Sequence, residues 1–223
     1  MSKPGWKHYD AAQYMLSYLS GTVDLGITYS STGNRRFYAY ADSDFGADET
    51  RKNCSGYVFI LANGPIRWKC SFSKEVALST CEAEVRAVSA MLEPTNTAIW
   101  IDKVLESLGL GEQYVEGVVE IKSSIDATPL TPMDIMEDNQ AAIAWSSNPV
   151  LSQRMRHVER GLLHVRQMVL EKKIRLVWIE TANQLAYMCI KGLAAPVFLR
   201  FVNMVMISAA DYRAVNELEE DQV

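Results

Sequence analysis

The middle of the sequence alternates between strand-forming and helix-forming patterns in an order that few folds accommodate. Runs of strand-forming residues cover 37–41, 56–61 and 66–72, and the last two flank Asn63-Gly64, a strong hairpin signal. A long helical period follows, and then two further strand–helix pairs. An antiparallel hairpin followed by strand–helix alternation predicts an α/β fold, with a five-stranded mixed sheet flanked by helices and any site near the strand ends.

The other segments are assigned from the same strand-forming and helix-forming patterns. Pro94 interrupts the long helical period and predicts a break or kink there. Gly109 and Gly111 open a poorly patterned loop that extends to about residue 132. The remaining expectations are helices over 6–19, 79–108, 139–145, 152–172, from 183 and after Gly192, and strands over 26–29, 133–137 and 174–180.

Composition excludes several classes of protein. The chain has 223 residues, 48% of them hydrophobic, which suffices for one sizeable core with an appended element. Its net charge of -5 argues against an autonomous, high-affinity nucleic-acid binder. Pro196, Arg200 and Asn203 interrupt the most apolar stretch, so we expect no membrane span. No secretory signal pattern begins the chain, and we expect a cytoplasmic or nuclear protein.

The cysteines and histidines form no metal-binding pattern. The cysteines lie far apart in the sequence without a Cys-x-x-Cys pair, so we expect buried, reduced thiols. The histidines are too few and too dispersed for a zinc site. These residues are Cys54, Cys70, Cys81, Cys189, His8, His157 and His164.

Two acidic residues stand where predicted strands end. Asp42 ends the first strand, and Asp138 separates a strand from a helix. A turn-forming aspartate explains the first position as simply as a catalytic role does, and a helix N-cap explains the second.

The helix that begins near residue 79 carries two glutamates on different faces. At 3.6 residues per turn, Glu82 aligns with Arg86, which predicts a solvated face with an ion pair. Glu84 aligns with Val88 at the edge of the apolar stripe. We therefore expect Glu84 to face the sheet and Glu82 to face water.

Asp42, Glu84 and Asp138 together form a candidate metal site. Carboxylates brought close together repel and take up protons unless a divalent cation neutralises them. Oxygen-only ligands favour Mg²⁺ or Mn²⁺, and two such ions could activate water and stabilise the leaving oxygen of a phosphodiester. Spacing in the sequence does not establish such a site unaided.

Several unrelated short motifs follow one another in the order typical of one family. Residues 6–7 (WK) and 18–22 (YLSGT) resemble the end of a copia-type reverse transcriptase. The motifs that resemble the ribonuclease H domain following it are 40–45 (YADSDF), 51–57 (RKNCSGY), 78–84 (LSTCEAE), 137–142 (EDNQAA), 148–149 (NP), 156–159 (RHVE) and 184–186 (QLA). From residue 4 to about 205, the chain resembles Pol polyproteins of copia-type LTR retrotransposons.

The resemblance implies a ribonuclease H-like fold and a Mg²⁺-dependent endonuclease, with Mn²⁺ as a substitute. In this family the domain cuts the RNA strand of an RNA–DNA hybrid during reverse transcription. The implied catalytic and metal-binding residues are Asp42, Glu84 and Asp138, the three that the residue patterns also select. Asp44 matches the motif too, and we interpret it as a supporting or structural residue. The implied partners are the hybrid and the reverse transcriptase portion of the polyprotein.

Tyr187 departs from the family pattern, in which this position holds a fourth carboxylate, usually Asp. A phenol, with a pKa of about 10, cannot replace a carboxylate as a Mg²⁺ ligand at neutral pH, and its ring would intrude on the second ion. Asn183 offers an amide oxygen one turn earlier, but a helix N-cap explains it more simply. We therefore expect impaired catalysis in this chain, as in a fragment of a decayed element.

Basic residues gather on the first three strands and their loops, where we expect some to contact the phosphates of a hybrid. Affinity should be weak without the polymerase portion to hold the hybrid. These residues are Arg35, Arg36, Arg51, Lys52, Arg67, Lys69 and Lys74.

We expect three parts: residues 1–33, a remnant of the reverse transcriptase end; residues 34–210, a ribonuclease H-like domain; and residues 211–223, an acidic disordered tail. Besides an endonuclease, the chain could be a non-catalytic ribonuclease H-fold module that serves as a spacer or interaction surface. An integrase-type nuclease of the same fold is less favoured, because no late helical glutamate stands in a matching context.

Overall fold

The computed structural model describes residues 3–29, 37–45, 53–73, 77, 79–108, 132–147 and 160–208. The chain divides into two compact units, one formed by residues 29–201 and the other by residues 1–28 with 202–223. The expected three-part division stays a prediction. Several predicted features lie outside the described residues: Arg35, Arg36, Arg51, Lys52, Lys74, the loop 109–131, Pro149, residues 152–159 with His157, and the tail 211–223.

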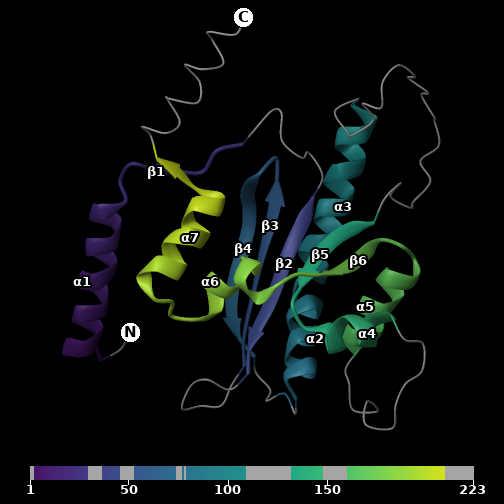
Figure 1. Cartoon of the computed structure of the whole chain (residues 1–223), viewed down its shortest axis with the longest axis horizontal. Helices are drawn as coiled ribbons and strands as arrows, with labels where there is room; N and C mark the ends of the chain where they lie inside the picture. The colour runs from purple at the N-terminus through teal and green to yellow at the C-terminus, as the bar shows by residue number, and fades with distance from the viewer. Residues whose placement is uncertain are drawn as a thin grey trace, which may run out of the picture. The chain divides into compact units, whose positions relative to one another are not determined.

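The larger unit is built on a five-stranded sheet in the order β4-β3-β2-β5-β6, which Figure 1 shows with α2 and α3 alongside it. Strands β2 (Tyr38–Asp44), β3 (Cys54–Leu61) and β4 (Gly64–Phe72) pair antiparallel in succession. Strand β5 (Met133–Glu137) is parallel to β2, and β6 (Ile174–Trp178) is parallel to β5. The predicted five-stranded mixed sheet is confirmed.

The β3–β4 hairpin turns at Ala62 and Asn63, whose φ angles are 50° and 65°. Two central residues with positive φ are what a type I′ turn requires, and this turn matches the twist of the strands. Gly64 already pairs with Leu61. The Asn63-Gly64 signal therefore located the hairpin but placed its turn one residue too late.

Two helices, α2 (Thr80–Ala90) and α3 (Leu92–Ser107), replace the single helix predicted over 79–108. Pro94 has no N–H, and its ring crowds the carbonyl four residues earlier, at Ala90, so the first helix ends there. Ser79 caps α2 because its Oγ accepts a hydrogen bond of 3.1 Å from the Glu82 N–H.

The hydrophobic core lies between the sheet and helices α2, α3 and α5 (Arg160–Leu170). Helix α4 (Gln140–Ser147) packs against α5 and α2. The helix expected from residue 183 is instead a 3-10 turn, η2 (Thr181–Asn183), followed by the short α6 (Tyr187–Ile190) and the longer α7 (Ala195–Val205). The buried core residues are Phe37, Ala39, Ala41, Tyr57, Phe59, Ala87, Val88, Met91, Leu92, Ala98, Ile99, Met133, Ile135, Val165, Met168 and Ile174.

The smaller unit contains α1 (Trp6–Gly21) and a two-stranded antiparallel sheet of β1 (Leu25–Gly26) and β7 (Ile207–Ser208). β1 is shorter than the strand expected over 26–29 and begins one residue earlier. Helix α1 forms as predicted, but none of its residues is buried. None of the helices in the described part of the chain has the length and apolar character that a membrane crossing requires.

Candidate metal centre

Asp42 lies within β2 rather than at its end, because the strand continues to Asp44. The parallel register pairs Tyr40 of β2 with Met136 of β5, so both strands lead two residues further to Asp42 and Asp138. The Asp42 side chain is buried, and its Oδ1 accepts a hydrogen bond of 2.8 Å from the Ser43 N–H.

Asp138 occupies the predicted junction between β5 and α4 but does not cap the helix. The capping residue is Asn139, whose Oδ1 accepts a hydrogen bond of 3.1 Å from the Ala142 N–H. Because Asn139 already accepts the hydrogen bond at the N-terminus of α4, the half-buried Asp138 carboxylate is not required as a helix cap.

The two glutamates of α2 differ as expected in direction but not fully in exposure. Glu84 is buried, and Glu82 forms the predicted ion pair with Arg86 at 2.9 Å. The Glu82 side chain is, however, only 14% exposed, so the expectation that it faces open water is wrong. The ion pair with Arg86, one turn further along α2, holds the Glu82 carboxylate along the helix surface.

The structure brings Asp42, Glu84 and Asp138 together, with one oxygen of each carboxylate within 4.8 Å of the others. Asp42 Oδ2 and Glu84 Oε2 are buried and have no hydrogen-bond partner among the described residues. Buried carboxylate oxygens normally have a partner, and a hard divalent cation is one that all three can share. The donor set and the orphaned oxygens therefore fit Mg²⁺ or Mn²⁺.

Burial and mutual repulsion favour neutralisation of the clustered carboxylates by protons or by a cation. Burial, followed by the repulsion from Asp138, raises the pKa of Asp42 to about 7. Burial, followed by the repulsion from Glu137, raises the pKa of Glu84 to about 9. In the absence of a cation these carboxyl groups hold protons near neutral pH, and a bound cation would displace them.

Glu137 is a further acidic residue beside the cluster that the sequence analysis did not single out. Its side chain is fully buried, and burial raises its pKa to about 8. Its Oε1 accepts a hydrogen bond of 3.1 Å from the Asn139 N–H, while its Oε2 has no partner among the described residues. The alternation along β5, which buries Met133, Ile135 and Glu137, was the signal that could have identified it.

Gln184 was also missed, apart from its place in a family motif. It is fully buried, and its Nε2 donates hydrogen bonds to the backbone oxygens of Ala41 at 2.8 Å and Met136 at 3.4 Å. These two acceptors immediately precede Asp42 on β2 and Glu137 on β5. Gln184 therefore ties together the two strands that carry the aspartates, a contact that no local pattern predicts.

Tyr187, where the resemblance led us to expect a fourth carboxylate, begins α6 and is half-buried. Lys191 Nζ lies 4.4 Å from the centroid of the Tyr187 ring and 3.6 Å from Asp44 Oδ1. The Lys191 ammonium also lowers the pKa of Asp42, against the larger effect of burial. A cationic side chain and an aromatic ring thus lie on the α6 side of the carboxylate cluster.

Asn183 does not have the role expected of it. It closes the η2 turn and is exposed, whereas the N-cap of α6 is Ala186. The N-cap prediction was wrong because Gln184 turns inward to the strands, which ends the turn at Asn183 and delays α6 to Tyr187.

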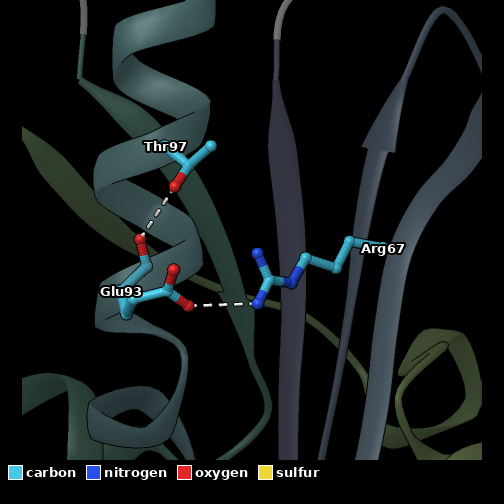
Figure 2. Close-up of polar contacts among 3 residues, drawn as sticks. All are labelled: Arg67, Glu93 and Thr97. Atoms are coloured by element: carbon cyan, nitrogen blue, oxygen red, sulfur yellow. Dashed lines mark hydrogen bonds and ion pairs between the residues drawn. The ribbon is translucent and has the colours of Figure 1, made fainter.

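Of the basic residues expected to contact a hybrid, Arg67 and Lys69 lie in the described part of the chain. Figure 2 shows Arg67 of β4 reaching Glu93 of α3, with 3.0 Å between Arg67 Nη2 and Glu93 Oε2. The Thr97 hydroxyl donates to the Glu93 backbone oxygen at 3.3 Å. The Arg67 charge is therefore shared with Glu93, which reduces its availability to a phosphate.

The larger unit belongs to the α/β class, with a five-stranded mixed sheet in which β2, α2 and the end of β5 carry the clustered carboxylates. The solved structure of LC11-RNase H1, isolated from compost, is 13% identical and matches with a TM-score of 0.46 over 70% of this chain and 93% of that one. No protein-family model matches the chain.

The sequence comparisons extend over almost the whole chain. A retrovirus-related Pol polyprotein from transposon RE2 of Arabidopsis thaliana is 29% identical over 202 residues, which are 90% of this chain and 12% of that protein. The corresponding polyprotein from transposon TNT 1-94 of Nicotiana tabacum is 29% identical over 193 residues, 86% of this chain and 13% of that protein. The chain is thus similar to retrovirus-related Pol polyproteins and spans about an eighth of their length.

Proposed function

We propose that the chain is a metal-dependent endonuclease-type domain for the RNA strand of RNA–DNA hybrids, impaired in this copy. The observation that carries the proposal is the convergence of Asp42, Glu84 and Asp138 within 4.8 Å, with buried oxygens that lack partners. The relatives support the proposal because they are retrovirus-related Pol polyproteins. The natural neighbour of the domain is then the reverse transcriptase portion of such a polyprotein.

Each carboxylate has a distinct support in the proposed site. Asp42 is fixed by the sheet and by the Ser43 N–H, Glu84 by the packed face of α2, and Asp138 by the turn into α4. A bound Mg²⁺ or Mn²⁺ would supply Lewis-acid stabilisation of the scissile phosphate. The residues of this chain hold that position, with Asp42 and Glu84 buried and Asp138 half-buried.

Impairment is proposed because α6 contributes a phenol where a fourth carboxylate would stand. Tyr187 adds no negative charge, and the adjacent Lys191 adds a positive one. Both features disfavour a second divalent ion on that side of the cluster. Cleavage that depends on two ions should therefore be very slow.

The same observation supports a second candidate function, a non-catalytic ribonuclease H-fold module. In this case Tyr187 and Lys191 fill the α6 side of the site, and the fold serves as a spacer or interaction surface. The two candidates differ in whether the carboxylates bind a divalent cation and cut a hybrid.

Single-turnover cleavage of a labelled RNA–DNA hybrid, with Mg²⁺ and with Mn²⁺, tests the proposal. We expect weak cleavage that a chelator abolishes and that Asp42→Asn abolishes. Asp134→Asn is the matched control, because Asp134 lies on β5 outside the cluster and pairs with Arg175 at 2.7 Å. Cleavage that persists in Asp42→Asn would exclude this site, and an absence of both cleavage and metal binding would favour the non-catalytic module.

A further inference from the structure

Two cysteines from adjacent strands meet at the open end of the β3–β4 hairpin. Cys54 Sγ lies 3.2 Å from Cys70 Sγ, although 16 positions separate the two residues in the sequence. The register pairs Cys54 with Phe72 and Gly56 with Cys70, so the cysteines are diagonal neighbours on one face of the two strands. A disulfide bond is about 2.05 Å long, so the two sulfurs must approach by roughly 1 Å. Diagonal neighbours on paired strands lie about 7–8 Å apart, so the strand ends must adjust slightly as the bond forms.

The two thiols differ in accessibility. Cys70 is exposed and Cys54 is buried, which corrects the expectation that the cysteines are all buried. Burial, followed by the hydrogen bond with Cys70, raises the pKa of Cys54 to about 12. An oxidant therefore reaches Cys70 first, and Cys54 is placed as the second thiol.

We propose that Cys54 and Cys70 form a site of reversible oxidation that reacts with low-molecular-weight disulfides of the glutathione type. This modification is independent of the proposed nuclease function. It depends only on the contact between the two sulfurs and on the exposure of one of them.

The reaction proceeds by two thiol–disulfide exchanges. The Cys70 thiolate attacks one sulfur of glutathione disulfide, which forms a Cys70–glutathione bond and releases one glutathione thiolate. Cys54 gives up its proton to solvent and attacks Cys70 Sγ, which forms the Cys54–Cys70 bond and expels the second glutathione. In total, two protein thiols and one glutathione disulfide yield one protein disulfide and two glutathione thiols.

Cys189 is the competing partner, since α6 places it over the same hairpin. A Cβ atom added at Gly56 would lie 3.1 Å from Cys189 Cβ. Burial, followed by the repulsion from Cys70, raises the pKa of Cys189 to about 11. Cys54 is favoured over Cys189 because its sulfur already contacts that of Cys70.

The disulfide would fix the end of β3 where this strand meets β2. Cys54 is the first residue of β3, and its register partner on β2 is Asp44. The hairpin is closed next to it by a hydrogen bond of 2.7 Å from the Ser73 N–H to the Asn53 oxygen. Oxidation should therefore slow the fraying of this end, seen as slower hydrogen exchange at the Ser73 amide and a melting temperature raised by several degrees.

The test treats the full, reduced chain with glutathione disulfide and then alkylates the free thiols. Of the four cysteines in the sequence, two should stay free, and peptide mapping should join the Cys54 peptide to the Cys70 peptide. Reduction with dithiothreitol should restore all of the free thiols. Four free thiols after treatment, or a bond that includes Cys81 or Cys189, would overturn the proposal.

Serine variants separate the steps. Cys54→Ser should stop at the mixed disulfide, with glutathione held on Cys70, whereas Cys70→Ser should leave Cys54 unmodified. Cys189→Ser is the matched control and should form the disulfide as the unaltered chain does. Loss of the bond in Cys189→Ser would assign the reaction to Cys189 instead. Where a variant does not fold, the peptide map of the unaltered chain still decides which cysteines are joined.

Discussion

Lys191 Nζ lies 3.6 Å from Asp44 Oδ1, and the same ammonium lies 4.4 Å from the centroid of the Tyr187 ring. The side chains of Lys191 and Asp44 are only 32% and 17% exposed, so solvent screens the pair incompletely. This contact links α6 to the end of β2, two residues beyond Asp42. The sequence led us to expect a supporting or structural role for Asp44. The contact specifies that role, because Asp44 holds the Lys191 ammonium beside the carboxylate cluster.

The first prediction concerns this pair. In a double-mutant cycle of Lys191→Met and Asp44→Asn, measured by urea unfolding, we expect a coupling energy of about 0.5–1 kcal/mol. Lys191→Met should also raise the pKa of Asp42, because the ammonium lowers it. Lys173→Met is the control, since Lys173 pairs with Glu171 far from the cluster in sequence and should leave the Asp42 titration unchanged. Additive single effects would show that the contact contributes nothing to stability.

The second prediction concerns Gln184. Gln184→Ala removes the hydrogen bonds to Ala41 and Met136 and leaves a cavity, so the free energy of unfolding should fall by about 2–3 kcal/mol. We also expect bound Mg²⁺ or Mn²⁺ to raise the melting temperature by less in this variant, because β2 and β5 lose the side chain that bonds to both. Gln167→Ala, on the exposed face of α5, should change stability by less than about 0.5 kcal/mol. Equal effects of the two substitutions would contradict the role assigned to Gln184.

The third prediction concerns the packing of α6 on β3. A Cβ at Gly56 would lie 2.5 Å from Ile190 Cγ2 and 3.3 Å from the Ala186 oxygen, so Gly56→Ala must shift the Ile190 side chain and crowd the backbone at the start of α6. We expect a loss of about 1–3 kcal/mol in chemical denaturation. A Cβ at Gly192 would meet nothing within 4 Å, so Gly192→Ala serves as the control. A neutral Gly56→Ala would mean that α6 packs less closely than described.

The fourth prediction concerns pH and metal. The folded-state pKa values of Asp42, Glu84 and Glu137 are about 7, 9 and 8, against ordinary values of 3.8, 4.5 and 4.5. The folded chain therefore binds more protons than the unfolded chain. The stabilisation is complete below about pH 4 and is lost as the pH rises to about 9. Calorimetry should show the melting temperature falling across this range.

Millimolar Mg²⁺ or Mn²⁺ should restore the melting temperature at about pH 8 and do little at about pH 5, where protons compete for the carboxylates. Asp42→Asn should remove most of the rise, and Asp134→Asn should retain it. Identical melting curves with and without the ions at about pH 8 would count against a metal site and favour the non-catalytic module.

The five-stranded mixed sheet could be predicted because each strand carries its own local signal: strand-forming runs, the Asn63-Gly64 hairpin and the alternation with helices. Asp138 could be located at the end of a strand and Asp42 within two residues of one, and the helical period distinguished Glu84 from Glu82. Gln184 and Glu137 could not be assigned in the same way, because their environment is made by contacts between distant segments. The contact between Cys54 and Cys70 depends on the strand register, which the sequence leaves open.

The last prediction concerns Tyr187. Tyr187→Asp places a carboxylate at the start of α6, where it removes the ring and offsets the charge of Lys191. The second ion would regain a ligand, and both the attacking and the leaving oxygen would then be stabilised. Losing a charge-stabilising element of this kind costs about 10² to 10³ in rate, so we expect at least about a tenfold gain in single-turnover hybrid cleavage.

Tyr187→Phe is the control and should give no gain. Adding Asp42→Asn to Tyr187→Asp should abolish the gain, because both residues act on one site. Robust cleavage by the unaltered chain would show that the fourth ligand lies elsewhere, whereas no gain in a folded, metal-binding Tyr187→Asp variant would make the non-catalytic module the better account.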